Sequence, residues 1–332
     1  MPFELDDEMR QWVREEMNLA GDPQQRLGQL LRAILHRNGN ELTYERGYTA
    51  TAREVWRTNR ANCLSFAHLY IGLARESGLR VYYLRVADLQ NFEKDGDLIV
   101  ASEHITAAYG PPTERRILEF LDQPVKKYHD TERISDLTAI ALYYSNLGAQ
   151  RIRESRFQEA EELLQTAVRL DPELADGWVN LGVSLRRLGR VAEAETSFRR
   201  ALEANAQLVP AYNNLAALLE RDGRTEEART LLDLSDRRGN RNPFSYLELG
   251  DLALREKRLD QAERFYRRAL SFDSEQAESL AALGQCALAA GRRREAERWF
   301  LRADAADPDN PRTLELARRL FGPVPIGRAS AD

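Results

Sequence analysis

Hydrophobic and polar residues follow different patterns in the two halves of the chain. From residue 141 to residue 310, apolar residues recur three or four positions apart, which is the spacing of one face of a helix. The first half mixes two kinds of pattern. Its helix-like stretches are residues 4–17, 27–35 and 62–81, and its strand-like stretches are residues 79–86, 97–110 and 115–122. We therefore expect an α+β N-terminal domain followed by an all-helical domain.

A period of 34 residues runs through the second half. Small residues recur at Gly148, Gly182, Ala216, Gly250 and Gly284, and again twelve residues later at Ala160, Ala194, Ala228, Ala262 and Ala296. Four residues after each alanine lies a large apolar residue, namely Leu164, Phe198, Leu232, Tyr266 and Phe300. Small residues let two antiparallel helices approach closely, and the large residue fills the gap between them. Each period therefore predicts one pair of packed helices.

This pattern resembles the tetratricopeptide repeat. The resemblance covers residues 141–310 as five units, with residues 311–321 as a capping helix and residues 322–332 as a disordered tail. It implies an all-α solenoid, in which stacked helix pairs form a superhelix with a concave groove that binds extended peptides or partner helices. Such an array performs no chemistry by itself.

Two series of polar residues are expected to line this groove. The sixth position of successive repeats holds Asn146, Asn180 and Asn214, and the thirteenth holds Arg153, Arg187, Arg221 and Arg255. A carboxamide both donates and accepts hydrogen bonds, so the asparagines suit a peptide backbone, as the resemblance to the groove of O-linked N-acetylglucosamine transferase implies. Guanidinium groups suit an acidic segment or a C-terminal carboxylate. The alternative is that both series belong to the repeat pattern and are solvated or paired internally.

The first half carries a cysteine, a histidine and carboxylates in an order that suits nucleophilic catalysis. Cys63 opens the helix-like stretch 62–81, and His104 lies in the strand-like stretch 97–110. A thiol at a helix N-terminus and near an imidazolium has a lowered pKa, which supplies thiolate at neutral pH. His68 follows Cys63 without any metal-ligand spacing, so we expect no metal site. Cys286, inside a repeat helix, is expected to be an ordinary buried thiol.

Residues 40–130 resemble the transglutaminase-like branch of the papain-fold cysteine enzymes, and we assign residues 41–140 to this domain after N-terminal helices in residues 1–40. The match rests on three segments, Thr51-Ala52-x-Glu54-Val55, Cys63-x-x-Phe66-Ala67-x-Leu69 and Leu73-Ala74-Arg75-x-x-Gly78-Leu79. The resemblance implies that Cys63 is the nucleophile, that His104 is the general base and acid, and that a carboxylate orients the imidazole. It implies no cofactor.

The turn between the last two strand-like stretches decides which carboxylate would orient His104. A hairpin centred on Pro111-Pro112 would place Glu119 opposite His104, whereas a turn centred on Thr113 would place Asp122 there. Because residues three apart point to opposite faces of a strand, only one of the two acids would face the imidazole. The position in the family pattern favours Glu119, and the acid type favours Asp122.

Composition narrows the classes of function. The 48 basic and 53 acidic residues give a net charge of -5, spread over both halves, which argues against a nucleic-acid binder. No apolar run reaches the roughly 18 residues of a membrane span. No secretory signal opens the chain, so a cytoplasmic location is expected.

Two hypotheses follow for the function. The first is a cysteine hydrolase or transamidase that acts on a protein or peptide recruited by the repeats. The second is a catalytically inactive scaffold or adaptor that mediates protein–protein interaction. Cys63 and His104 favour the enzyme, whereas Ala61, which stands where the resembled family has glycine, favours the scaffold.

Overall fold

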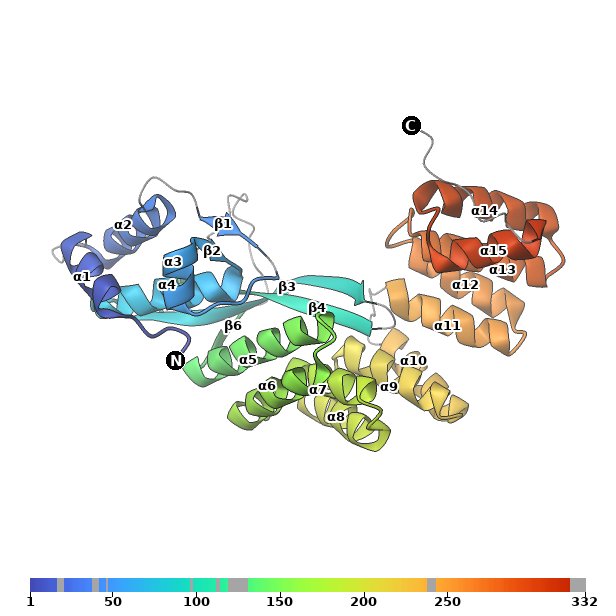
Figure 1. Cartoon of the computed structure of the whole chain (residues 1–332), viewed down its shortest axis with the longest axis horizontal. Coiled ribbons are helices and arrows are strands. Elements are labelled where there is room, and N and C mark those ends of the chain that lie inside the picture. The colour runs from blue at the N-terminus through green and yellow to red at the C-terminus, as the bar shows by residue number, and fades with distance from the viewer. Residues whose placement is uncertain are drawn as a thin grey trace. The chain divides into compact units, whose positions relative to one another are not determined.

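The computed structural model divides the chain into two compact units, Met1–Leu208 and Val209–Asp332 (Figure 1). It describes residues 1–16, 21–37, 42–45, 47–95, 98–111, 114–118, 131–237 and 243–322. Glu119, Asp122 and the expected tail beyond Gly322 lie outside the described residues. The boundary between the units falls after the second helix pair of the repeats.

The N-terminal part of the first unit contains, among its described residues, four helices and two sheets. The helices are α1 (Asp7–Glu16), α2 (Pro23–Leu35), α3 (Ala52–Thr58) and α4 (Cys63–Glu76). Two short strands pair in parallel, β1 (Thr43–Tyr44) and β2 (Arg60–Ala61). The main sheet is antiparallel with the order β5-β4-β3-β6, and its strands are β3 (Val81–Asp95), β4 (Leu98–Tyr109), β5 (Arg116–Leu118) and β6 (Thr131–Ile134).

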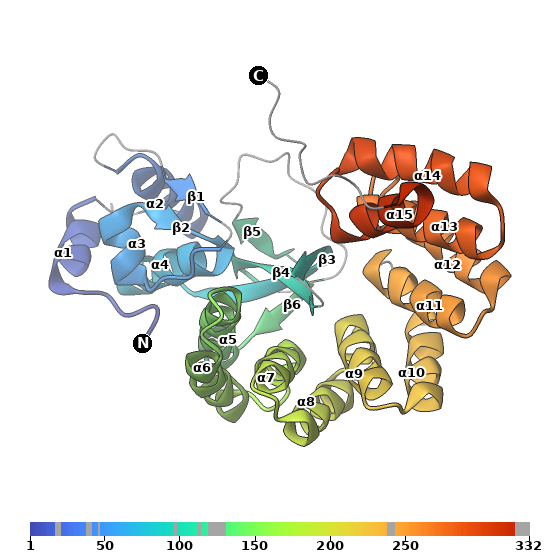
Figure 2. The same cartoon turned by 45° about the vertical axis from the view of Figure 1, so that its right-hand side comes forward.

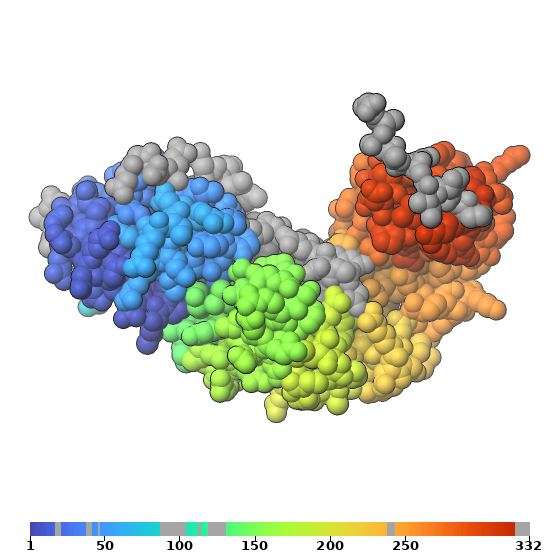
Figure 3. Space-filling view, in the orientation of Figure 1, coloured from blue at the N-terminus to red at the C-terminus, as the bar shows by residue number. Residues whose placement is uncertain are grey.

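Helix α4 is the centre of the N-terminal core. The side chain of Asn62 caps its first turn by accepting a hydrogen bond from the backbone N–H of Ser65 at 2.8 Å. Nearly every residue of α4 from Leu64 to Ala74 is buried, because helices pack on one side of it and β3 and β4 on the other. The space-filling view shows the N-terminal helices, in blue, adjoining the first repeat helices, in green (Figure 3).

The register between β4 and β5 differs from both registers expected from the sequence. Ala107 pairs with Leu118. The register that faces His104 with Glu119 would have paired Ala107 with Arg116, and the register that faces it with Asp122 would have paired Ala107 with Glu119. Gly110 adopts a φ of 88° in the connection, so the turn is not the symmetric one that was expected.

Among the described residues, the repeats form five helix pairs and a last single helix (Figure 2). The first helices of the pairs, called A helices below, are α5 (Asp136–Arg153), α7 (Ala175–Arg187), α9 (Val209–Arg221), α11 (Pro243–Arg255) and α13 (Ala277–Ala289). The second helices, called B helices, are α6 (Phe157–Leu170), α8 (Val191–Ala204), α10 (Thr225–Arg237), α12 (Leu259–Leu270) and α14 (Arg293–Ala306). The last helix is α15 (Pro311–Phe321).

The predicted pairing of small and large residues holds in three of the repeats with glycine. A Cβ on Gly148 would lie 2.5 Å from Leu164, and Gly182 and Gly250 stand in the same relation to Phe198 and Tyr266. The fifth repeat differs from the expectation. There the space beside Gly284 is filled by Leu316 of α15, whereas Phe300 is only partly buried and contacts Phe321.

Candidate functional site

Cys63 is the first residue of α4, as the sequence predicts, and its side chain is partly exposed. The positive end of the helix dipole therefore acts on its thiol. Helix α4 packs against β4, the strand that carries His104. The structure thus places both residues in neighbouring elements of the first unit.

The His104 side chain does not point toward α4, the helix that carries Cys63. Tyr83 pairs with Ala107, both belong to the core that α4 covers, and the Tyr83 hydroxyl hydrogen-bonds to His68 of α4. His104 pairs with Val86 in the same ladder. Because side chains alternate along a strand, His104 points to the face opposite α4. The catalytic pairing of Cys63 with His104 stays a prediction, as do the roles of Glu119 and Asp122.

His68 is completely buried in the first unit. Its Nδ1 and the Tyr83 hydroxyl share a hydrogen bond of 2.8 Å, and the rings of Phe3 and Tyr143 lie beside it. Burial lowers the pKa of His68 to about 3, with a small opposing effect of Asp136. His68 is therefore a neutral core residue at physiological pH.

The asparagine series is held by the repeats themselves at two of its three positions. Asn180 donates a hydrogen bond from Nδ2 to Ser145 Oγ of the preceding A helix at 3.1 Å. Asn214 is 2% exposed and donates to the backbone carbonyl of Pro210 at 2.9 Å. Asn146 is partly buried. Asn180 and Asn214 thus bond within the array, and the burial of Asn214 leaves it no open surface for a peptide.

The arginine series lies on the surface. All four side chains at the thirteenth position are exposed, namely those of Arg153, Arg187, Arg221 and Arg255. Each is the last residue of its A helix, where a positive charge also complements the helix dipole. Arg255 forms an ion pair with Glu220 of the preceding A helix, so part of its charge is neutralised within the second unit.

The second unit also contains a partly buried ion pair that the sequence analysis missed. Arg312 of α15 donates to both carboxylate oxygens of Asp251 in α11, and its Nε donates to Gln285 at 2.9 Å. The Tyr266 hydroxyl donates to Asp251 at 2.7 Å. The two charged side chains are 17% and 23% exposed. This network fixes the last helix to the A helices before it.

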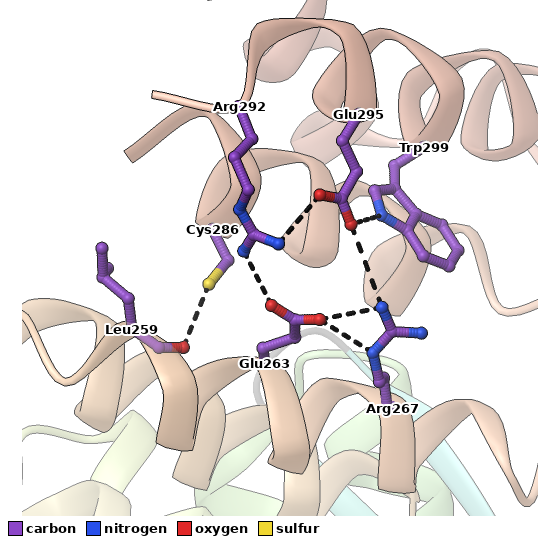
Figure 4. Close-up of polar contacts among 7 residues, drawn as sticks. All are labelled: Leu259, Glu263, Arg267, Cys286, Arg292, Glu295 and Trp299. Atoms are coloured by element: carbon purple, nitrogen blue, oxygen red, sulfur yellow. Dashed lines mark hydrogen bonds and ion pairs between the residues drawn. The ribbon is translucent and has the colours of Figure 1, made fainter. Parts of the chain in front are cut away.

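Arginines in the turns between A and B helices join successive B helices through ion pairs. In Figure 4, Arg292 at the start of α14 bonds Glu295 of its own helix at 2.8 Å and Glu263 of α12 at 2.7 Å. Arg190 bonds Glu193 and Glu161 in the same way in the first unit. A recurring arginine followed five residues later by a recurring glutamate was the available signal.

No three histidine, cysteine, aspartate or glutamate side chains among the described residues come together as metal ligands would. No described helix is long and apolar enough to cross a membrane.

Comparison with known proteins identifies the repeats. Residues 150–209, 211–235 and 253–320 match models of the tetratricopeptide repeat, which confirms the repeats predicted from the 34-residue period. No curated protein matches the chain.

The chain is similar to several solved structures. The pilF protein of Pseudomonas aeruginosa is 21% identical, with a TM-score of 0.51 over 56% of this chain and 85% of that one. MamA is 16% identical, with a TM-score of 0.43 over 57% of this chain and 98% of that one. YrrB, described as a TPR protein with an unusual peptide-binding site, is 18% identical, with a TM-score of 0.42 over 54% of this chain and 92% of that one. The likeness to pilF concerns the fold alone.

Proposed function

We propose that this chain, which carries an array of tetratricopeptide repeats, is a scaffold that binds a protein or peptide partner along its A helices. The observation that carries this proposal is the exposed arginine at the end of each of four A helices, at one and the same repeat position. Within each unit, stacked repeats present corresponding positions on one side, so Arg153 with Arg187 in the first unit and Arg221 with Arg255 in the second each make a recurring positive surface.

The chemistry of these residues favours a partner with carboxylates. A guanidinium group offers paired donors that match a carboxylate, and such contacts are stronger than neutral hydrogen bonds. Arg187 and Arg221, which are exposed at the ends of the consecutive A helices α7 and α9, are the residues chosen for the test. The asparagines contribute less, since Asn180 and Asn214 bond within the array.

The test uses the full chain as bait in a pull-down, with quantitative mass spectrometry of the captured proteins. Arg187→Gln and Arg221→Gln together should reduce capture of the specific partner and flatten the salt dependence of what remains, because salt screens charge pairs. Asn180→Ala is the matched control and should change capture little. Equal capture by the wild-type chain and the arginine variant would refute the proposal.

A second function, acyl transfer at Cys63, is favoured by the position of the thiol at the start of α4. In such a reaction the Cys63 thiol gives up its proton, its sulfur attacks an amide carbonyl of a protein substrate, and a thioester forms as the amide C–N bond breaks and the amine leaves with that proton. Water or a second amine then takes the acyl group and releases the thiol. Incorporation of a biotinylated amine into casein by the wild-type chain, and its loss in Cys63→Ala, would support this function. No incorporation above that of Cys63→Ala would end it.

A further inference from the structure

Helices α12 and α14, the B helices of the second unit's last two repeats, carry exposed arginines at corresponding positions. These arginines, called the basic cluster below, are Arg264 and Arg268 in α12 and Arg294, Arg298 and Arg302 in α14. Arg298 and Arg302 stand 34 residues after Arg264 and Arg268. The same two positions of the first three repeats hold Glu162, Thr166, Thr196, Arg200, Thr230 and Leu234, with one arginine among the six. The repeat pattern therefore does not account for the basic cluster.

The basic cluster is not neutralised within its own helices. No described carboxylate forms an ion pair with Arg264, Arg294 or Arg298, because the glutamates of α12 and α14 pair with other arginines. Figure 4 shows two of these glutamates with their partners. Arg294, Arg298 and Arg302 follow one another at intervals of four residues, a spacing at which like charges destabilise a helix. This row of charges therefore does not serve the stability of α14.

Aromatic rings restrain two of these arginines without removing their charge. The Arg302 guanidinium lies 5.1 Å from the ring centre of Trp299, and its Nη2 donates to the Ser274 carbonyl at 3.2 Å. The Arg268 guanidinium lies 4.8 Å from the ring centre of Phe272. A cation–π contact orients a guanidinium group and leaves its positive charge in place. Less side-chain freedom is then lost when an anion binds.

We propose that the basic cluster is a docking surface for a short segment of a partner protein that is rich in aspartate and glutamate. Helices α12 and α14 are neighbours, because Arg292 at the start of α14 bonds Glu263 of α12. Carboxylates of the segment pair with guanidinium groups on both helices, each of which offers two parallel donors. This surface lies on B helices, whereas the exposed arginines of the proposed scaffold function end the A helices.

The charges around the basic cluster favour a short acidic segment over a longer polyanion. The turns that follow α12 and α14 carry exposed carboxylates, namely those of Asp273, Glu275, Asp307 and Asp309. The whole chain has 53 acidic and 48 basic residues. A nucleic acid or an anionic membrane extends beyond two helices and would meet these negative charges, which repel it. A short segment can pair with the arginines and avoid the carboxylates.

The experiment measures binding of a fluorescein-labelled oligoglutamate peptide to the full chain by fluorescence anisotropy, at an ionic strength of about 0.15 M. The peptide should bind saturably. Arg264→Gln with Arg298→Gln should weaken its binding about tenfold or more, because charge-assisted contacts are lost at two equivalent positions. An affinity that this variant leaves unchanged, or binding that is absent at this ionic strength, would overturn the proposal.

Arg200→Gln with Arg318→Gln is the matched control. It removes the same charge from exposed arginines that pair with Glu203 and Glu315. The control should change the affinity by less than about twofold, since exposed ion pairs contribute little. Equal weakening by the control and by the cluster variant would show that only net charge matters, and the basic cluster would then not be a site.

Charge reversal separates the loss of a surface from the loss of the fold. Arg264→Glu with Arg298→Glu should abolish binding of oligoglutamate and create binding of an oligolysine peptide of equal length, because the sign of the complementary charge is exchanged. Circular dichroism checks that the variant is folded, which is expected because both side chains are exposed. A folded variant that still binds oligoglutamate and gains no oligolysine binding would contradict the proposal.

Other sites and other occupants are outcomes of the same measurement. Oligothymidylate and vesicles that contain phosphatidylserine are the competing probes, and tighter binding of either, lost in the cluster variant, would assign the surface to nucleic acid or membrane and refute the proposal. The peptide is also tested on a chain with glutamine at four A-helix positions, those of Arg153, Arg187, Arg221 and Arg255. If that change alone abolishes binding, the peptide sits on the A helices, so this proposal is wrong while the scaffold function stands.

Discussion

Gly182 of α7 leaves the space that the ring of Phe198 in α8 occupies. A Cβ atom on residue 182 would lie 2.6 Å from that ring, and Phe198 is fully buried, so neither group has room to move aside. Gly182→Ala should therefore lower the free energy of unfolding by about 1–3 kcal/mol, although alanine is the better helix former. Urea denaturation followed by circular dichroism measures this change.

Gly28 of α2 is the matched control for that substitution. A Cβ there would lie 3.8 Å from the flexible end of Arg32, which is an ordinary contact. Gly28→Ala should raise the free energy of unfolding by up to about 1 kcal/mol through helix propensity alone. If the two variants changed stability in the same direction, close packing would not explain the recurring glycines.

The helix pairs could be predicted from the sequence because both partners of each contact lie within one period. Gly182 and Phe198 lie in the two helices of one repeat, so the spacing of small and large residues already predicts which helices pack together. The capping helix shows the limit of this reasoning. Leu316 fills the space beside Gly284 that Phe300 was expected to fill, because the last repeat has a different neighbour from the others.

Contacts between repeats and between strands could not be predicted in the same way. Arg292 and Glu263 are 29 residues apart and meet only because successive B helices stack side by side. The pairing of β4 with β5 depends on the conformation of the connection at Gly110, which periodicity does not contain. The face of the sheet to which His104 points likewise depends on how the strands pair and on which side α4 packs, and the spacing of residues gives neither.

The burial of His68 predicts a loss of stability in mild acid. Its pKa in the folded protein is about 3, below the 6.5 of an exposed histidine, so the unfolded chain binds a proton that the folded chain does not. Its contribution to stability is complete above about pH 6.5 and is lost progressively as the pH falls toward 3. The slope should approach about 1.4 kcal/mol per pH unit. Urea titrations at pH 7, 6 and 5 would measure it.

His68→Gln should reduce that pH dependence, because glutamine keeps a hydrogen-bonding group beside Tyr83 but does not titrate. His36→Gln, at an exposed histidine of the same unit, is the matched variant for comparison. An unaltered acid slope in His68→Gln would mean that carboxylates elsewhere account for the loss.

The ion pair between Arg312 and Asp251 should stabilise the second unit through its partly buried position. Arg312→Met would leave the Asp251 carboxylate without its charged partner, and we expect a loss of about 3–5 kcal/mol. Arg255→Met removes the more exposed pair with Glu220 and should cost about 0–1 kcal/mol. Thermal unfolding of the three proteins compares them. A similar melting temperature for both variants would contradict the stabilising role of the Asp251 network.

The two cysteines should differ in their reaction with iodoacetamide at neutral pH. Cys286 is fully buried, its thiol donates to the Leu259 carbonyl at 3.4 Å, and burial raises its pKa, with a further increase from Glu263 (Figure 4). Cys63 is partly exposed at the N-terminus of α4 and should react first.

Mass spectrometry of timed samples gives the two labelling rates, and the His104→Ala variant separates two explanations for a fast Cys63. Slower labelling in that variant would show that the imidazole lies close enough to support the thiolate, as catalysis requires, and would contradict the placement of His104 on the face opposite α4. An unchanged fast rate would assign the reactivity to exposure and the helix dipole alone, which agrees with His104 lying on the face opposite α4. Equal rates for Cys63 and Cys286 in the wild-type chain would contradict both explanations and leave Cys63 an ordinary thiol.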